Sequence, residues 1–199
     1  MGTSATLVML AVFSGLSMNL ILQFGLSPKG MAFESSYRRE RLLAGSAILF
    51  ITVMLLWLVL SFARSVIFLG LVEYIVLFPA SCLVFSILEY LTNRFIIKDA
   101  GQPETAPGYA IFNSALAGAA LFITLNVAGG FWEALVLSLC FSGGAALVFV
   151  IVYEIRRRSE MEAVPLPLRG GSLALIAMGL LSLVFSSCAL MLYEVLGAR

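Results

Sequence analysis

Six long apolar stretches dominate this chain, and they constrain its fold more than any other feature. They cover about residues 6–26, 42–63, 66–91, 111–128, 134–154 and 173–196. A helix of roughly 20 apolar residues crosses a bilayer core about 30 Å thick. Because lipid admits only helices or closed barrels, long runs without polar alternation indicate helices. The sequence therefore predicts an all-α integral membrane protein with six transmembrane helices.

The composition agrees with a membrane protein and removes several classes of function. Of the 199 residues, 61% are hydrophobic and 12% are charged, whereas a soluble domain carries roughly 25% charged residues. The net charge of +1 supplies no basic face for a nucleic-acid partner. The chain has no His, which excludes imidazole metal ligands and His general bases. We predict no catalytic residue and no metal site on this chain alone.

The distribution of basic residues predicts the orientation. Lys and Arg gather in cytoplasmic loops of membrane proteins. Ten of the 12 basic residues follow the first, third or fifth apolar stretch: Lys29, Arg38, Arg39, Arg41, Arg94, Lys98, Arg156, Arg157, Arg158 and Arg169. Only Arg64 and Arg199 belong to the other side. We expect a multi-pass protein of the cytoplasmic (inner) membrane with both termini outside.

Three spans followed by three more predict a single membrane domain, residues 1–199, made of two repeats. Residues 1–92 would form the first repeat and residues 110–199 the second, and an odd number of spans in each makes them inverted. Spans one and four would then be counterparts. Both contain an Asn and small residues: Asn19, Gly25 and Ser27 in one, and Asn113, Ser114 and Gly118 in the other. Two interpretations stay open, close helix packing through small residues or interrupted helices 1 and 4 that face each other across a functional site.

Three polar residues within apolar stretches are candidates for an ion path: Glu73, Asn19 and Asn113. An intramembrane carboxylate is a functional candidate by default. The alternative is that Glu73 lies at the membrane interface near the outer end of the third span, close to Arg64.

The three cysteines, Cys82, Cys140 and Cys188, all lie in apolar runs. An odd number without C-x-x-C spacing predicts no disulfide framework. We expect them to be small buried hydrophobic residues.

The stretch "EIRRRSEMEAVPLPLRGGSLALIAMGLLSLVF", residues 154–185, carries a resemblance to a known family. It resembles the RnfA/NqrE-type membrane subunits of the Rnf and Nqr ion-translocating electron-transport complexes. The loop motif V-P-x-P-x-R-G of that family falls on Val164, Pro165, Pro167, Arg169 and Gly170. Six spans, outward termini and chain length also match this type of membrane protein. The resemblance implies that the motif belongs to a loop that contacts partner subunits.

The resemblance also explains the two small-residue stretches. In the family, a G-L-C-P turn and a T-N-C segment provide two cysteines. With two more from a paralogous subunit, these hold one [2Fe-2S] cluster in the membrane. This chain has Gly25-Leu26-Ser27-Pro28 and Phe112-Asn113-Ser114, with serine at both ligand positions. Because such clusters need thiolates, we expect no cofactor on this chain and no normal intramembrane cluster at Ser27 and Ser114.

The family implies the leading functional hypothesis. The chain would be a membrane subunit of a redox-driven ion pump, a translocase, and would serve as scaffold and as a candidate ion or electron path. Its partners would be the paralogous subunit of inverted topology, other Rnf/Nqr-type subunits that carry flavins and Fe–S centres, and the lipid bilayer. The alternative is a small inverted-repeat secondary transporter that moves a solute between helices 1 and 4.

Overall fold

The computed structural model describes residues 3–24, 39–66, 70–95, 112–161 and 171–195, and these residues form helices and short turns without a strand. The elements are α1 (Thr3–Val12), the π-helical turn η1 (Phe13–Ser17), α2 (Leu20–Phe24), α4 (Arg39–Val66), α5 (Gly70–Phe95), α6 (Ser114–Val127), α7 (Phe131–Met161) and α8 (Gly171–Val195). Each predicted apolar stretch coincides with one of these helices or, for the first stretch, with α1, η1 and α2 together.

The helices fall into a long and a short set. Four of the described helices are long and apolar enough to cross a membrane, through Leu42–Ser65, Ile75–Thr92, Phe131–Ile155 and Leu175–Val195. Two apolar segments are shorter, Leu7–Leu22 and Ser114–Val127. The prediction of an all-α, multi-pass membrane protein is therefore confirmed. These two short segments correspond to spans one and four, the spans that we expected to be interrupted. The arrangement of the chain as two inverted repeats stays a prediction.

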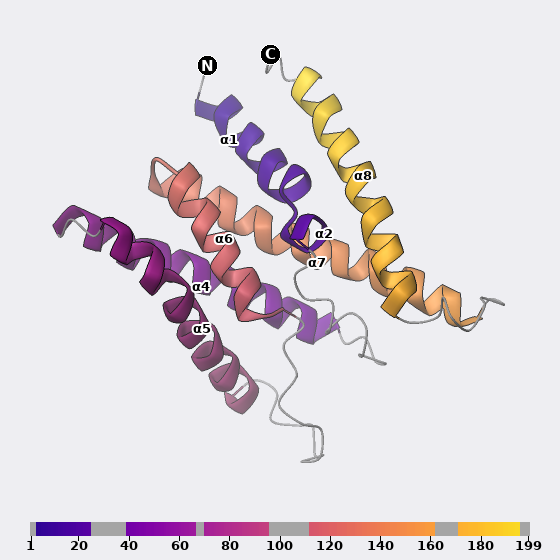
Figure 1. Cartoon of the computed structure of the whole chain (residues 1–199), viewed down its shortest axis with the longest axis horizontal. Helices are drawn as coiled ribbons and strands as arrows, with labels where there is room; N and C mark the ends of the chain where they lie inside the picture. The colour runs from indigo at the N-terminus through magenta and orange to yellow at the C-terminus, as the bar shows by residue number, and fades with distance from the viewer. Residues whose placement is uncertain (1–2, 25–38, 67–69, 96–111, 162–170, 196–199) are drawn as a thin grey trace.

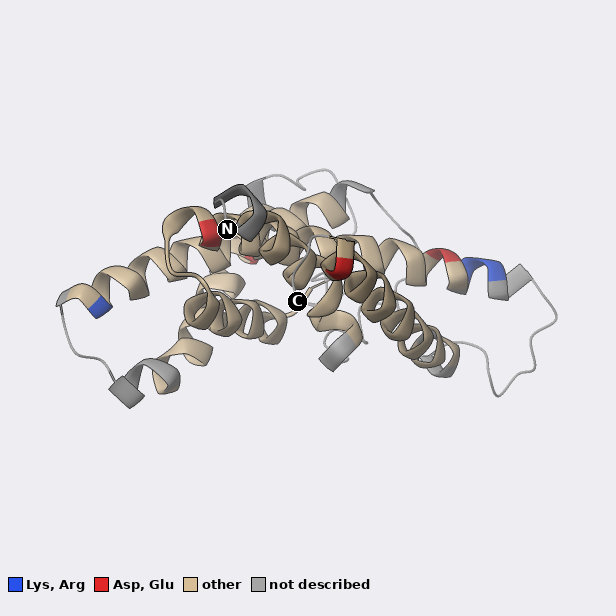
Figure 2. Ribbon diagram, turned by 90° about the horizontal axis from the view of Figure 1, so that it is seen from above, with Lys and Arg blue, Asp and Glu red and all other residues tan. Residues whose placement is uncertain are grey.

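The long helices α4 and α7 pack against each other across the middle of the molecule (Figure 1). The short helix α6 lies against α4, α5 and α7, while η1 lies against α7 and α8. The start of α1 and the end of α8 lie at the same side, the top of Figure 1. In Figure 2, the Lys and Arg residues among those described lie at the two far ends of the long axis, whereas Asp and Glu also occur nearer the middle.

The core lies where α2, α4, α6 and α7 meet. Leu49 and Val53 of α4, Leu116 and Leu121 of α6 and Val148 of α7 are all almost completely buried. In contrast, α5 and α8 bury a much smaller share of their spans. Their exposed apolar side chains include Phe78, Leu83, Leu183 and Leu190. These faces are available to lipid or to a partner protein.

The cysteines correct one prediction. Cys82 and Cys188 are exposed on the surface of the chain and Cys140 is half-buried, so they are not the buried residues that we expected. The reason is physical. In a membrane protein apolar side chains face lipid as readily as the core, and an apolar run therefore does not imply burial.

Candidate functional site

The first helix is interrupted inside its apolar stretch, between η1 and α2. The backbone amide of Met18 donates to the carbonyl of Phe13 over 2.7 Å, which is π-type pairing. The backbone amide of Asn19 donates to the carbonyl of Leu16 over 3.4 Å. Met18 has φ −103° and ψ 39°, outside the helical region. This break lies before the predicted Gly25–Pro28 turn. Ser27 and Gly25 themselves lie outside the described residues.

The side chain of Asn19 is buried at this break. It is only 2% exposed, and its Nδ2 donates to the carbonyl of Gly15 over 3.2 Å. Its Oδ1 is buried and has no hydrogen-bond partner among the described residues. Buried polar atoms are nearly always paired, so this oxygen marks a place where a ligand or water would complete the structure.

Gly144 of α7 allows the break to lie close to its neighbour. A Cβ at this position would be 2.7 Å from the carbonyl oxygen of Gly15 and 3.1 Å from Asn19 Nδ2. The adjacent Ser14 is fully buried and donates to the carbonyl of Leu10 over 2.8 Å. The sequence analysis missed Gly144, because a glycine inside a long apolar helix does not reveal which helix approaches it.

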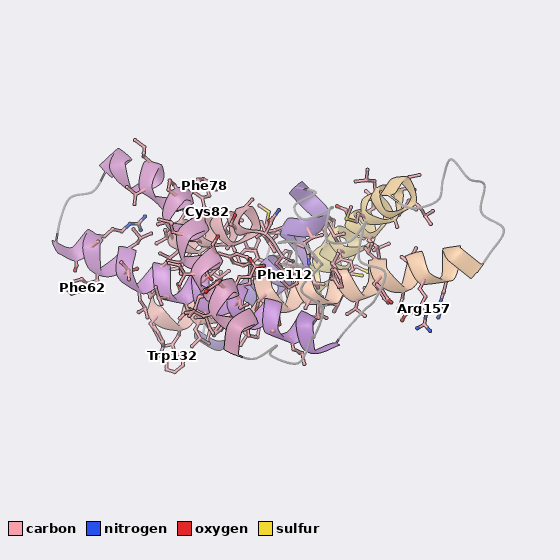
Figure 3. The ribbon with its side chains drawn as sticks, turned by 90° about the horizontal axis from the view of Figure 1, so that it is seen from below. Phe62, Phe78, Cys82, Phe112, Trp132 and Arg157 are labelled. Carbon is pink, nitrogen blue, oxygen red and sulfur yellow. The ribbon has the colours of Figure 1, made fainter. Side chains whose placement is uncertain are left out.

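The second small-residue stretch forms the start of α6. Asn113 is the N-cap, and its Oδ1 accepts a hydrogen bond from the amide of Leu116 over 2.9 Å. The next residue, Ser114, accepts a hydrogen bond from the thiol of Cys82 on α5, with 3.4 Å between Sγ and Oγ. Figure 3 labels Cys82 and Phe112, the buried residue before the cap.

Ser114 and Gly118 also form a close contact between α5 and α6. A Cβ on Gly118 would be 2.8 Å from a ring carbon of Phe78 and 2.9 Å from Ser81 Oγ. The small residues one turn apart thus bring the two helices together, as the packing interpretation predicts. Packing and a functional role are not exclusive here, since the same contact positions Ser114 beside Cys82.

The donor set at Ser114 does not match half of a [2Fe-2S] site. Such a half-site needs two thiolates, whereas this position has a hydroxyl whose hydrogen-bond partner is a single thiol on another helix. Cys82 is the residue that sequence reasoning missed at this point. No spacing rule could have found it, because 32 residues separate it from Ser114.

The remaining predicted site residues are not positioned in detail. Glu73 lies in the first turn of α5, and its side chain is not among those described. The motif residues Pro165, Pro167, Arg169 and Gly170 lie outside the described part of the chain.

A bundle of long apolar helices around a broken helix defines a multi-pass, all-α membrane protein. The chain is similar to the A subunit of the ion-translocating oxidoreductase complex of Pectobacterium atrosepticum, with 32% identity over 112 residues, 53% of this chain and 56% of that relative. The corresponding proteins of Yersinia enterocolitica and Histophilus somni are 40% and 38% identical over 73 residues, 37% of each chain. These matches confirm the resemblance that the sequence motifs predicted. The chain spans about half the length of the curated relatives it matches. No family model matches it, and no solved structure does.

Proposed function

We propose that this chain is a membrane subunit of an ion-translocating electron-transport complex of the Rnf type. The observation that carries this proposal is the similarity to the A subunits of ion-translocating oxidoreductase complexes, found on a chain with the spans of a multi-pass membrane protein. The protein serves as scaffold and as part of the ion path, in the inner membrane with both termini outside. It is not catalytic alone.

Its partners are the paralogous membrane subunit of inverted topology and the proteins of the complex that carry flavin and Fe–S centres. The exposed apolar faces of α5 and α8 support this assembly. The exposed thiol of Cys82 lies on the same face of α5 as Phe78 one turn away, where a partner helix can cover both.

The intramembrane [2Fe-2S] cluster of the family is absent from this chain's half of the interface. Serine hydroxyls replace both thiolates, and the hydroxyl of Ser114 is hydrogen-bonded to Cys82 instead. When bound in the family, this cluster relays electrons. Here Ser114 takes part in the contact between α6 and α5 instead.

Among the ion-path candidates, Asn19 has the strongest support. The oxygen of Asn113 is used by the helix cap, whereas the oxygen of Asn19 is buried without a partner among the described residues. Glu73 remains a candidate on the sequence alone.

Purification from the native membrane in mild detergent tests the proposal. We expect several proteins in fixed ratio, together with flavin and iron. Ser27→Cys and Ser114→Cys in a Cys82→Ala background should then create a new [2Fe-2S] signal in EPR, provided by two thiolates from each of the two paralogous proteins. The Cys82→Ala background removes the neighbouring thiol that would compete by forming a disulfide. A wild-type complex with a cluster between Ser27 and Ser114 would contradict the proposed loss of ligands.

The broken first helix also favours a second function, a small inverted-repeat secondary transporter. Interrupted helices with buried polar groups bind solutes near the middle of the membrane, and Asn19 lies at such a break. Recovery of the chain as a homodimer without flavin or iron, active in solute uptake in liposomes, would establish this function and reject membership of a redox complex.

A further inference from the structure

Two charged side chains bind the backbone where α6 ends and α7 begins. Arg64, in the last turn of α4, donates from Nη1 to the carbonyl of Leu125 over 3.2 Å. Glu133, in the first turn of α7, accepts a hydrogen bond through Oε2 from the amide of Gly129 over 2.7 Å. Both partners are main-chain groups, so each bond depends on the position of the turn between the two helices.

The two bonds are linked through the end of α6. If the helix continued, the amide of Gly129 would donate to the carbonyl of Leu125. That amide donates to Glu133 instead, and the backbone of Ala128 is already extended, with φ −76° and ψ 117°. Arg64 therefore supplies the donor that the helix no longer provides to Leu125.

The signs of the two charges suit their positions. The C-terminal end of a helix carries partial negative charge and the N-terminal end partial positive charge. Arg64 binds at the end of α6 and Glu133 lies at the start of α7, so each charge meets a helix end of opposite sign. Hydrogen bonds with an ionised partner are roughly twice as strong as neutral ones. This bond also gives a structural use to Arg64, one of the two basic residues predicted on the non-cytoplasmic side.

The position of this turn also affects the opposite end of α6. The helix has 14 residues and spans about 21 Å as one rod, so a displacement at one end moves the other end too. At its start, Ser114 accepts from the thiol of Cys82, and Gly118 meets the ring of Phe78. In lipid, helix association depends on packing and interhelical hydrogen bonds rather than on the hydrophobic effect. A charged bond to α4 is therefore well suited to fix where α6 lies along its neighbours.

We propose that Arg64 and Glu133 form a clasp that fixes the axial position of α6 and so holds Ser114 beside Cys82. Arg64 ties the end of α6 to α4, and Glu133 ends α6 at the turn by taking the amide of Gly129. Both are positioning residues. The inference goes beyond the proposed function and does not depend on it, since it concerns only contacts within this chain.

Disulfide formation between Cys82 and Ser114→Cys reports the position of α6. The cross-linked peptides are quantified over time by mass spectrometry in the purified full-length protein under mild oxidation. Adding Arg64→Met, which keeps the length of the side chain without a donor, should slow the cross-link severalfold. Arg64→Lys restores a charged donor and should recover part of the rate. Glu133→Ala should also slow it, whereas Glu133→Gln keeps an oxygen that can accept from Gly129 and should slow it less.

Two control variants separate positioning from a general loss of stability. Gly144 lies about 16 Å along α7 from Glu133, and Gly144→Ala introduces a close contact with Gly15 there. It should lower Tm but leave the cross-linking rate unchanged. Arg158→Met removes an exposed arginine in the last turn of α7 and should change neither.

Equal cross-linking rates with and without Arg64→Met and Glu133→Ala would overturn the clasp. A Ser114→Cys protein that forms no cross-link would overturn it as well, because Ser114 would then not be held at Cys82. A loss of rate in either control as large as in Arg64→Met would reject the positioning role and attribute the effect to general destabilisation.

Discussion

Asn19 and Asn113 are the same residue type in two similar small-residue stretches, yet their side-chain oxygens differ in hydrogen bonding. Asn113 Oδ1 accepts from the amide of Leu116 and closes the first turn of α6. Asn19 Oδ1 has no such partner among the described residues. Asn113 directly precedes α6 and uses its oxygen to cap the free amides there, whereas Asn19 lies between η1 and α2 and uses its Nδ2 to donate to the carbonyl of Gly15.

Asn113→Ala should lower the free energy of unfolding by about 1 kcal/mol, because loss of an N-cap leaves the amide of Leu116 without its acceptor. Asn113→Ser should lose less, since serine is also a good cap. Unfolding in detergent, followed by far-UV circular dichroism, measures both. Equal losses for the two variants would show that the cap does not stabilise α6.

Ser114→Cys should form a disulfide with Cys82 under mild oxidation, because the two side-chain atoms are already 3.4 Å apart. Mass spectrometry of the oxidised protein would detect the cross-linked peptides. Ser114→Cys with Cys82→Ala is the control and should give none. Absence of the cross-link in the single variant would place α5 and α6 differently.

At the scale of elements, the two shorter apolar segments carry the polar features, and the long helices support them. The 14 residues of α6 span only about 21 Å at 1.5 Å per residue, less than a bilayer core of about 30 Å. Both short segments pack against other helices: α6 against α4, α5 and α7, and the first segment against α7 and α8. Backbone groups at their ends are then satisfied inside protein rather than in lipid.

Gly144→Ala should destabilise the packing of η1 on α7 by about 1–3 kcal/mol, since the added Cβ would lie 2.7 Å from the backbone oxygen of Gly15. Gly143→Ala is a matched control, because a Cβ there meets nothing within 4 Å and alanine favours a helix. Thermal unfolding of the two variants makes the comparison. A Gly143→Ala protein as unstable as Gly144→Ala would argue against the close contact.

At the scale of the whole molecule, the start of α1 and the end of α8 lie at the same side of the bundle (Figure 1). An even number of crossings produces this arrangement. The basic residues then decide which side faces the cytoplasm.

Reporter fusions should locate Ser36, Gln102 and Glu162 in the cytoplasm and both termini outside. The basis is the excess of Lys and Arg in the three loops that contain these residues. Alkaline phosphatase and green fluorescent protein fusions give opposite signals on the two sides and serve as mutual controls. A cytoplasmic C-terminus would reject the six-span topology.

The sequence by itself determined the class of fold, the approximate ends of the helices and a family resemblance. Length and continuity of an apolar run are one-dimensional properties, and the bilayer converts them directly into helices. The V-P-x-P-x-R-G motif and the serine positions could likewise be read without coordinates.

Only the tertiary structure decided where the first helix breaks, that Gly144 approaches Asn19, and that Cys82 donates to Ser114. It also reversed the expected burial of Cys82 and Cys188. These facts depend on which helix faces turn toward each other. In lipid, an apolar helix face has nearly the same free energy against a neighbouring helix as against acyl chains. Hydrophobicity along the sequence therefore does not specify which helices touch. Side-chain packing does.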